Sequence, residues 1–148
     1  MSVREKEAVE LFAKGYNCAQ AVIGVFCQGS ELDKNTALKL ANGFGGGMRC
    51  GEVCGVVSGA VMAVGLKCGF YTEGDLAQKN YCNQKTYEFI ERFTQENGSV
   101  TCRDLLGVDI RGPGGLETPE AKQAREAICP RLVASAVRIV EGMDFTIN

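Results

Sequence analysis

Eight cysteines are the residues of this chain with the most reactive side chains. Four of them are predicted in the first turn of a helix: Cys18, Cys54, Cys102 and Cys129. Asn17 and Thr101 are favoured N-cap residues, and Pro130 favours the first position of a helix. At a helix start, free backbone N–H groups and the helix dipole stabilise a thiolate and lower its pKa. Since the thiolate is the form that attacks disulfides and binds metals, these four thiols are the candidate reactive set.

The other four cysteines carry weaker signals. Cys50 lies four residues before Cys54, so on a helix both thiols would share a face and reach one metal ion or each other. This spacing is not the C-x-x-C of thioredoxin-like proteins. The remaining three, Cys27, Cys68 and Cys82, lie near predicted helix ends or on apolar faces, where cysteine behaves as a small buried hydrophobic residue.

Several classes of chemistry are excluded by composition. The chain has no histidine, so it has no imidazole base, no histidine metal ligand and no C-x-x-C-H site for haem attachment. Its net charge of −2 and its lack of basic runs argue against a nucleic-acid partner. The glycine-rich stretch 43–48 lacks the last glycine of a dinucleotide fingerprint and follows a predicted helix, so it is interpreted as a loop.

The apolar segments predict a protein that does not insert into a membrane. The longest apolar run, residues 53–66, is too short to cross a bilayer, and the N-terminus does not resemble a secretory signal. We therefore expect a cytoplasmic protein. In a reducing compartment, eight cysteines point to redox chemistry or metal binding before structural disulfides.

Helical periodicity dominates the elements that must position these thiols. Residues 1–148 are predicted to form one all-α domain, a compact bundle of about six or seven helices. The expected helices span residues 3–14, 18–28, 35–42, 50–68, 72–96, 102–106 and 118–141, with a kink or restart at 129–130.

Small residues recur every four positions along the helix expected at 50–68. They are Gly51, Gly55, Gly59 and Ala63. Glycine inside a helix costs about 1 kcal/mol relative to alanine, so three glycines on one face require compensation. Close approach of a second backbone provides it, either within the bundle or across a homodimer.

Four segments of the chain, which together extend over most of its length, resemble the C_GCAxxG_C_C family of redox-active proteins. They are Gly15-Tyr16-Asn17-Cys18, Gly45-Gly46-Gly47-Met48 leading to Cys54-Gly55-Val56-Val57-Ser58-Gly59, Cys102-Arg103-Asp104-Leu105-Leu106-Gly107, and Cys129-Pro130. The family alanine after Cys-Gly is Val56 here. The resemblance implies that the family's four cysteines are the four at helix starts. The domain is also similar to the non-haem part of split-Soret cytochromes, in which cysteines hold an iron–sulfur centre.

Three hypotheses follow for the function. In the first, Cys18, Cys54, Cys102 and Cys129 perform thiol–disulfide or electron-transfer chemistry with a redox partner whose identity the sequence leaves open. In the second, Cys54, Cys102 and Cys129, with Cys18 or Cys50, hold an iron–sulfur cluster or zinc. In the third, the chain is a structural or interaction module without catalysis, and its cysteines fill the core.

Overall fold

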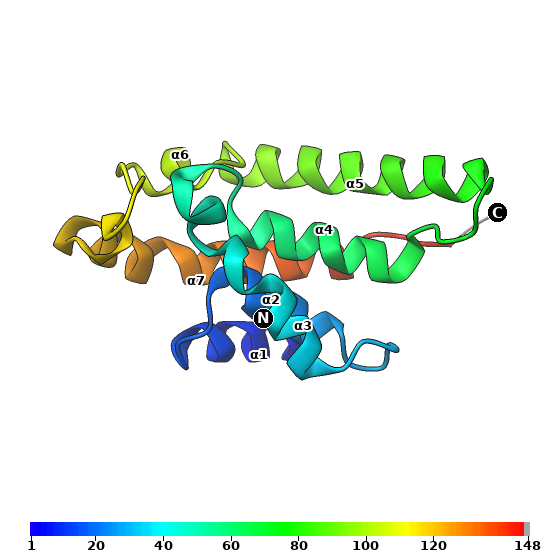
Figure 1. Cartoon of the computed structure of the whole chain (residues 1–148), viewed down its shortest axis with the longest axis horizontal. Coiled ribbons are helices and arrows are strands. Elements are labelled where there is room, and N and C mark those ends of the chain that lie inside the picture. Colours follow the sequence, from blue (N-terminus) through cyan, green and yellow to red (C-terminus); the bar gives the residue numbers. More distant parts are fainter. Residues whose placement is uncertain (147–148) are drawn as a thin grey trace.

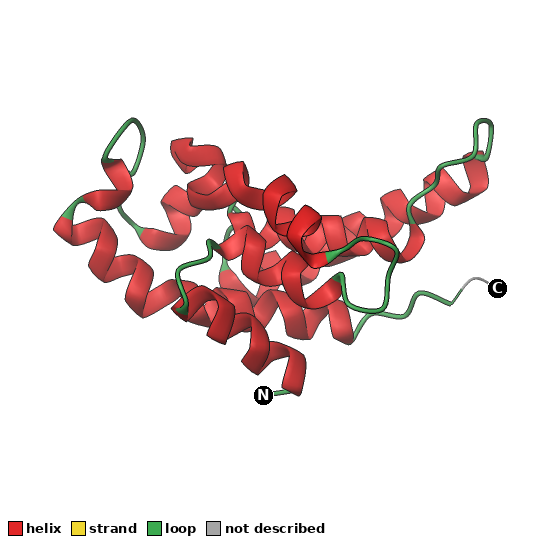
Figure 2. Ribbon diagram, turned by 60° about the horizontal axis from the view of Figure 1, so that its bottom comes forward, coloured by secondary structure: helices red, strands yellow, loops and turns green. Residues whose placement is uncertain are grey.

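The computed structural model of the chain describes residues 1–146 and confirms the all-α class. Within these residues there are seven α-helices and no strand. The helices are α1 (Val3–Ala13), α2 (Cys18–Phe26), α3 (Lys34–Ala41), α4 (Gly55–Cys68), α5 (Leu76–Asn97), α6 (Cys102–Leu106) and α7 (Pro119–Glu141). Three short helical turns lie between them: η1 (Asn42–Phe44), η2 (Gly47–Gly51) and η3 (Gly115–Glu117). Figure 2 shows these helices and the loops that join them.

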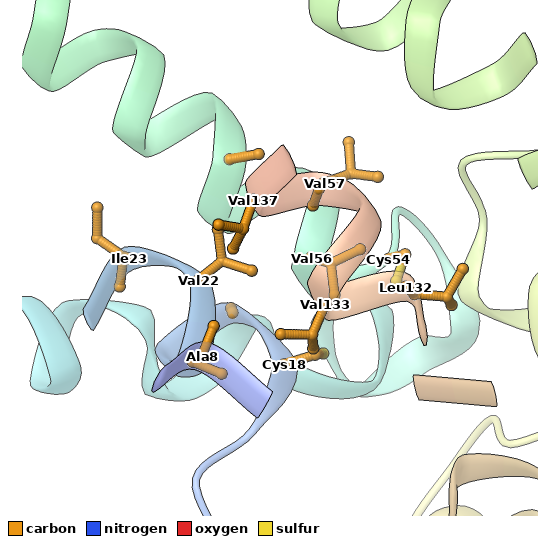
Figure 3. Close-up of a cluster of buried hydrophobic side chains, with 14 of the residues drawn as sticks. Ala8, Cys18, Val22, Ile23, Cys54, Val56, Val57, Leu132, Val133 and Val137 are labelled. Carbon is orange, nitrogen blue, oxygen red and sulfur yellow. The ribbon is translucent and has the colours of Figure 1, made fainter. Parts of the chain in front are cut away.

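The core forms where α2, α4, α5 and α7 meet. In Figure 1, α5 lies along the top, α4 beneath it, and α1, α2 and α3 lie below, with α7 crossing behind. The contact between α2 and α4 is the most extensive of any pair of elements. Val22, Val56 and Val137 bring α2, α4 and α7 together in one fully buried cluster (Figure 3). No helix among residues 1–146 has both the length and the apolar character needed to span a bilayer.

Two of the predicted caps place cysteines at helix starts. The Asn17 side chain accepts a hydrogen bond from the Gln20 N–H, and the Gln20 side chain accepts one from the Asn17 N–H. This capping box begins α2 at Cys18. Thr101 accepts a hydrogen bond from the Asp104 N–H and begins α6 at Cys102. Both cysteines therefore occupy the first helical position, as the sequence predicts.

The prediction of a helix start at Cys129 is wrong. Helix α7 runs without interruption from Pro119 to Glu141, with Pro130 in its interior. An interior proline removes one backbone hydrogen bond and crowds the preceding turn. The buried face that follows it, including Leu132 and Val133, packs into the core and keeps the helix continuous. Cys129 consequently has no free helix-start N–H groups beside it.

The predicted helix over residues 50–68 begins only at Gly55, and Cys54 is its N-cap residue. Residues 47–51 form a wide turn instead. In this turn Met48 and Arg49 have φ values of 62° and 60°, a left-handed conformation that is uncommon for residues other than glycine. Cys50 therefore lies outside the helix and does not share a helix face with Cys54.

Backbone hydrogen bonds fasten the segment after this turn to the start of α6. The Cys102 N–H donates to the Glu52 carbonyl at 2.7 Å, and the Cys54 N–H donates to the Val100 carbonyl at 2.7 Å. These two bonds flank an isolated antiparallel bridge between Val53 and Thr101. The bridge brings the N-cap of α4 beside the first residue of α6, although 48 positions separate Cys54 from Cys102 in the sequence.

The face of small residues packs inside the chain. A Cβ at Gly59 would lie 2.8 Å from the Ala19 carbonyl oxygen, and a Cβ at Gly55 would collide with the Cys18 sulfur. Ala63 is fully buried, and Gly51 lies in η2 rather than on the helix. Because α2 covers Gly55 and Gly59, close approach within the bundle compensates for these glycines, and nothing among residues 1–146 supports the alternative, a homodimer through this face.

Candidate redox site

The four cysteines at the predicted helix starts line one small cavity. Cys18 comes from α2, Cys54 from the N-cap of α4, Cys102 from α6 and Cys129 from α7; each is at most 8% exposed. The cavity has a volume of about 30 Å³, room for roughly two water molecules. Its other walls are formed by Phe12, Asn17, Gly46, Arg49, Leu105, Leu106, Leu116, Arg125 and Leu132. Figure 3 shows Cys18 and Cys54 within the apolar cluster that includes Leu132.

Cys18 is the thiol most easily ionised. A hydrogen bond from the Cys54 thiol is the main reason that the pKa of Cys18 falls to about 7 from the usual 9.0. Burial opposes this shift, and the backbone N–H groups of Gly46 and Ala19 support it. Ala19 belongs to the first turn of α2, so the helix start contributes as expected for a cysteine at this position.

The other three thiols of the cavity stay protonated near neutral pH. The hydrogen bond with Cys18 and burial together raise the pKa of Cys54 well above its usual value. Burial raises the pKa of Cys102 to about 11 and that of Cys129 to about 12, and the negative charge of Cys18 adds to both shifts. The prediction that all four thiols have a lowered pKa is therefore wrong for three of them. Burial outweighs the helix-start effect at Cys102, the hydrogen bond with Cys18 adds to burial at Cys54, and Cys129 is not at a helix start.

The structure places the remaining cysteines outside the cavity. Cys50 is exposed, and its thiol donates to the Gly47 carbonyl at 3.4 Å. Cys27 is buried, with its thiol donating to the Gly24 carbonyl at 3.3 Å, as expected for a small core residue. Cys68 and Cys82 lie near the other end of α4 and along α5. In the second hypothesis, the fourth ligand is therefore Cys18 rather than Cys50.

Two arginines at the cavity were not found by sequence reasoning. Arg49 and Arg125 both line it, and neither forms an ion pair with any residue from 1 to 146. The charge of Arg125 opposes the upward pKa shifts of Cys102 and Cys129. Arg125 lies four residues before Cys129 and so shares its helix face, which was a readable signal. Arg49 reaches the cavity from the left-handed turn at residues 47–51, and no sequence pattern indicated that position.

An all-thiol donor set suits an iron–sulfur cluster, in which each cysteine binds one of several irons. In the part of the chain that the structure describes, no three cysteine or carboxylate side chains lie close enough to hold a single metal ion. Zinc ligation therefore does not fit this arrangement. An iron–sulfur cluster would be held by the four thiols that line the cavity.

The sequence profile described as "Putative redox-active protein (C_GCAxxG_C_C)" matches residues 16–143. The chain belongs to the C_GCAxxG_C_C family. No curated protein and no solved structure matches it significantly.

The geometry gives a physical reason for one glycine in this C_GCAxxG_C_C protein. Gly55 directly follows Cys54, and any side chain there would collide with the Cys18 sulfur. Glycine at this position therefore allows the Cys18 thiol to approach the start of α4. Val56, which replaces the family alanine, is fully buried in the core and does not line the cavity.

Proposed function

We propose that this protein performs thiol–disulfide exchange at the four-cysteine cavity, with Cys18 as the attacking thiolate and Cys54 as the second thiol. The observation that carries the proposal is that Cys18, at a helix start, and Cys54 line one cavity, where the Cys54 thiol lowers the pKa of Cys18. A thiol with a pKa near the ambient pH is close to optimal for attack on a disulfide, because it is ionised and still nucleophilic. Membership of a family described as redox-active supports the same chemistry.

The proposed reaction oxidises two cysteines and reduces one disulfide of the partner. The Cys18 thiolate attacks one partner sulfur, the partner S–S bond breaks, and the first partner thiolate leaves and is protonated. The Cys54 thiol then loses its proton and attacks the Cys18 sulfur. The mixed disulfide breaks, a Cys18–Cys54 disulfide forms, and the second partner thiol is released. The reverse sequence reduces the protein.

Cys102 and Cys129 extend the site to four thiols. Both stay protonated while Cys18 carries the negative charge, which limits the charge buried in the cavity. Their position in the same cavity allows a disulfide formed at Cys18 to pass to a second pair. A reducing compartment such as the cytoplasm suits a protein whose eight cysteines are all free.

Thiolate titration tests the proposal. The ultraviolet absorbance of the thiolate, followed against pH, is expected to show one group with a midpoint near 7 in the wild type and none in Cys18→Ser. In redox buffers of reduced and oxidised dithiothreitol, the wild type is expected to form the Cys18–Cys54 disulfide reversibly, a loss of two free thiols that Cys18→Ser does not show. Cys27→Ser is the matched control, because Cys27 is a buried thiol outside the cavity. This variant should keep the titration midpoint near 7 and the reversible loss of two thiols.

Two results would contradict the proposal. One is a Cys18 that titrates no earlier than Cys27. The other is a wild-type thiol count that does not respond to the redox buffer, which would favour a module without redox activity.

The convergence of four cysteines on one cavity also favours a second candidate, iron–sulfur binding. Cys18, Cys54, Cys102 and Cys129 would hold the cluster, which would supply one-electron transfer. Strictly anaerobic purification followed by iron and sulfide analysis distinguishes the two candidates. Stoichiometric iron and sulfide with a visible absorption band select the cluster. A colourless protein with a reversible two-thiol change selects disulfide exchange.

A further inference from the structure

A surface groove adjoins the four-cysteine cavity. It has a volume of about 160 Å³, several times that of the cavity, and is lined by Phe12, Gly15, Tyr16, Lys122, Arg125 and Glu126. Phe12 and Arg125 also line the cavity, so the two spaces share these side chains. A molecule in the groove would therefore lie beside the reactive thiols. The groove is smaller than a typical drug-sized pocket, which suits a small organic molecule.

The charge of the groove selects for an anion. Its lining has two positively charged side chains, Lys122 and Arg125, and one negatively charged side chain, Glu126. Arg49 adds a further positive charge in the adjoining cavity. Lys122 is engaged only in an exposed ion pair with Glu117 at 3.8 Å, which is a weak interaction. Arg125 is half-buried and has no ion-pair partner within residues 1–146. A guanidinium in this state is a ready partner for a carboxylate, which it can bind through two parallel hydrogen bonds.

We infer that this groove binds a small disulfide that carries carboxylate groups, and that Arg125 holds one carboxylate while the S–S bond faces the cavity. The inference rests on the proposed function, because a disulfide bound in the groove reacts only if Cys18 can attack it as a thiolate. The chemistry is the exchange described above, in which the partner disulfide is reduced to two thiols and Cys18 and Cys54 are oxidised. Arg125 acts by positioning the disulfide.

Three small disulfides of different charge test the inference on the full chain. They are the dianionic dithiodipropionate, the neutral bis(hydroxyethyl) disulfide and the dicationic cystamine. The rate at which each oxidises Cys18, followed by mass spectrometry of its peptide, is divided by its rate with free mercaptoethanol, which removes differences in intrinsic reactivity. We expect the normalised rates to fall in the order anionic, neutral, cationic. Added salt should reduce this preference by screening it.

Arg125→Gln is expected to reduce the ratio of anionic to neutral rates by roughly threefold to fivefold, the range for a partly exposed ion pair. The ratio isolates binding, because any change in thiol pKa affects both disulfides alike. Arg131→Gln is the matched control, since Arg131 is an exposed arginine on the same helix that lines a different hollow. It should leave the ratio unchanged.

The outcomes separate the two proposals. If the disulfides oxidise Cys18 without a charge preference, or if Arg125→Gln keeps the preference, the groove inference fails and the proposed function stands. If none of the disulfides oxidises Cys18 in the folded protein although all oxidise it in the denatured protein, the proposed function fails and the groove inference fails with it.

A second inference concerns two cysteines at the opposite end of α4. Cys68 is the last residue of α4, about 20 Å along the helix from Cys54. The Gln78 side chain, in the first turns of α5, donates to the Cys68 carbonyl at 2.6 Å. Cys82 follows Gln78 by four residues, so it faces the same part of α4. Figure 1 shows the end of α4 and the start of α5 together at the right of the molecule.

The two thiols differ in access. Cys68 is 5% exposed and belongs to the core, whereas Cys82 is half-buried and packs against that core. Burial, with a smaller contribution from the neighbouring Cys82 thiol, raises the pKa of Cys68 to about 12. Lys85, one turn beyond Cys82, brings a positive charge that opposes this shift.

We propose that Cys68 and Cys82 form a disulfide under oxidising conditions, which links α4 to α5. Cys82, the accessible thiol, attacks a small external disulfide and releases one thiol. Cys68 then loses its proton, attacks the Cys82 sulfur and releases the second thiol. This reaction requires neither the cavity nor its cysteines.

Peptide mapping tests this second proposal directly. Cleavage after Lys67, Lys79 and Lys85 separates Cys68, on residues 68–79, from Cys82, on residues 80–85. After treatment with the neutral disulfide and alkylation, mass spectrometry without reduction should find these two peptides linked. The midpoint of thermal unfolding should rise by several degrees in the wild type and not in Cys82→Ser. Recovery of both peptides in alkylated form, or linkage of either one to another cysteine, would overturn the proposal.

Discussion

Cys18 and Cys54 have the same side chain, but their positions in the fold shift their pKa values in opposite directions. Cys18 has the first-turn amides of α2 around it and the Cys54 thiol as a donor, so its pKa falls to about 7. Cys54 is an N-cap residue that donates toward a negative charge, so its pKa rises. Both are almost fully buried, and burial alone would raise both values. Hydrogen bonding therefore decides which of them has the lowered pKa.

Removing the Cys54 donor should disable Cys18. In Cys54→Ala, the pKa of Cys18 is expected to rise toward the ordinary cysteine value, because its largest stabilising contact is gone and burial remains. Cys54→Ser retains a donor and should keep most of the shift. The pH dependence of thiolate absorbance measures both variants. Equal midpoints in the wild type and Cys54→Ala would show that the backbone N–H groups suffice.

Cysteine ionisation also makes stability depend on pH. The folded-state pKa of Cys18, about 7, lies below its unfolded value of 9.0, so its contribution is complete above pH 9 and is lost as the pH falls through 7. The raised pKa values of Cys102 and Cys129, about 11 and 12, act in the opposite sense and cost stability as the pH rises above 9. The free energy of unfolding should therefore have a maximum near pH 8–9 as far as the thiols contribute.

Denaturant unfolding from about pH 6 to about pH 10 measures this profile. Cys18→Ser should lose the rise of roughly 1–3 kcal/mol between pH 7 and pH 9, and retain the fall above it. A wild-type profile without that rise would indicate that Cys18 ionises normally.

At the scale of elements, the contact between α2 and α4 depends on glycine. Gly59 lies against the Ala19 carbonyl and the Val22 side chain, while Gly65, on the same helix, has open space where a Cβ would lie. The same residue type thus has different physical roles six positions apart. Gly59 permits close packing that positions Cys18 relative to Cys54, whereas Gly65 only weakens the helix.

Alanine substitution should separate these roles. Gly59→Ala is expected to destabilise the protein by about 1–3 kcal/mol, because the new methyl group overpacks against backbone. Gly65→Ala is expected to stabilise it by up to about 1 kcal/mol through helix propensity. Denaturant midpoints provide the comparison. A neutral Gly59→Ala would mean that α2 and α4 pack less closely than described.

At the scale of the whole molecule, Arg138 joins three helices. From α7 it pairs with the buried Glu5 of α1 at 3.7 Å and with Glu96 of α5. Glu5 is only 5% exposed, so its carboxylate depends on this partner more than a surface carboxylate would. The arginine therefore connects the N-terminal helix to the long helices that carry the core.

Arg138→Leu should destabilise the protein by roughly 1–2 kcal/mol, since it leaves a buried carboxylate unpaired while half of the arginine side chain is exposed to solvent. Arg92→Leu is the control, because Arg92 pairs with Glu88 on the surface of α5 and should cost less than about 0.5 kcal/mol. Thermal unfolding of both variants measures the difference. Equal effects would place Glu5 in a more solvated setting.

Much of the fold could be predicted because helix signals are local. The caps at Asn17 and Thr101 and the Thr118-Pro119 start of α7 depend on residues within one turn, and the structure has all three. Predictions that needed more distant information failed. Pro130 lies inside a helix that core packing keeps continuous, and residues 47–51 adopt a left-handed turn that no periodic pattern indicates. For the face that carries Gly55 and Gly59, the sequence left open whether the closely packed neighbour is a helix of the same chain or a second copy of the chain.

The sequence by itself determined the all-α class, since helical periodicity is a local property of the chain. Its motifs resemble the C_GCAxxG_C_C family, and that resemblance pointed to the four cysteines of interest. Only the tertiary structure decided that these cysteines share a cavity, that the glycine face is covered by α2, and that Cys50 lies apart. It also decided that Cys18 is the thiol with the lowered pKa. The physical reason is that its burial and its hydrogen bond with Cys54 both arise from residues distant in sequence.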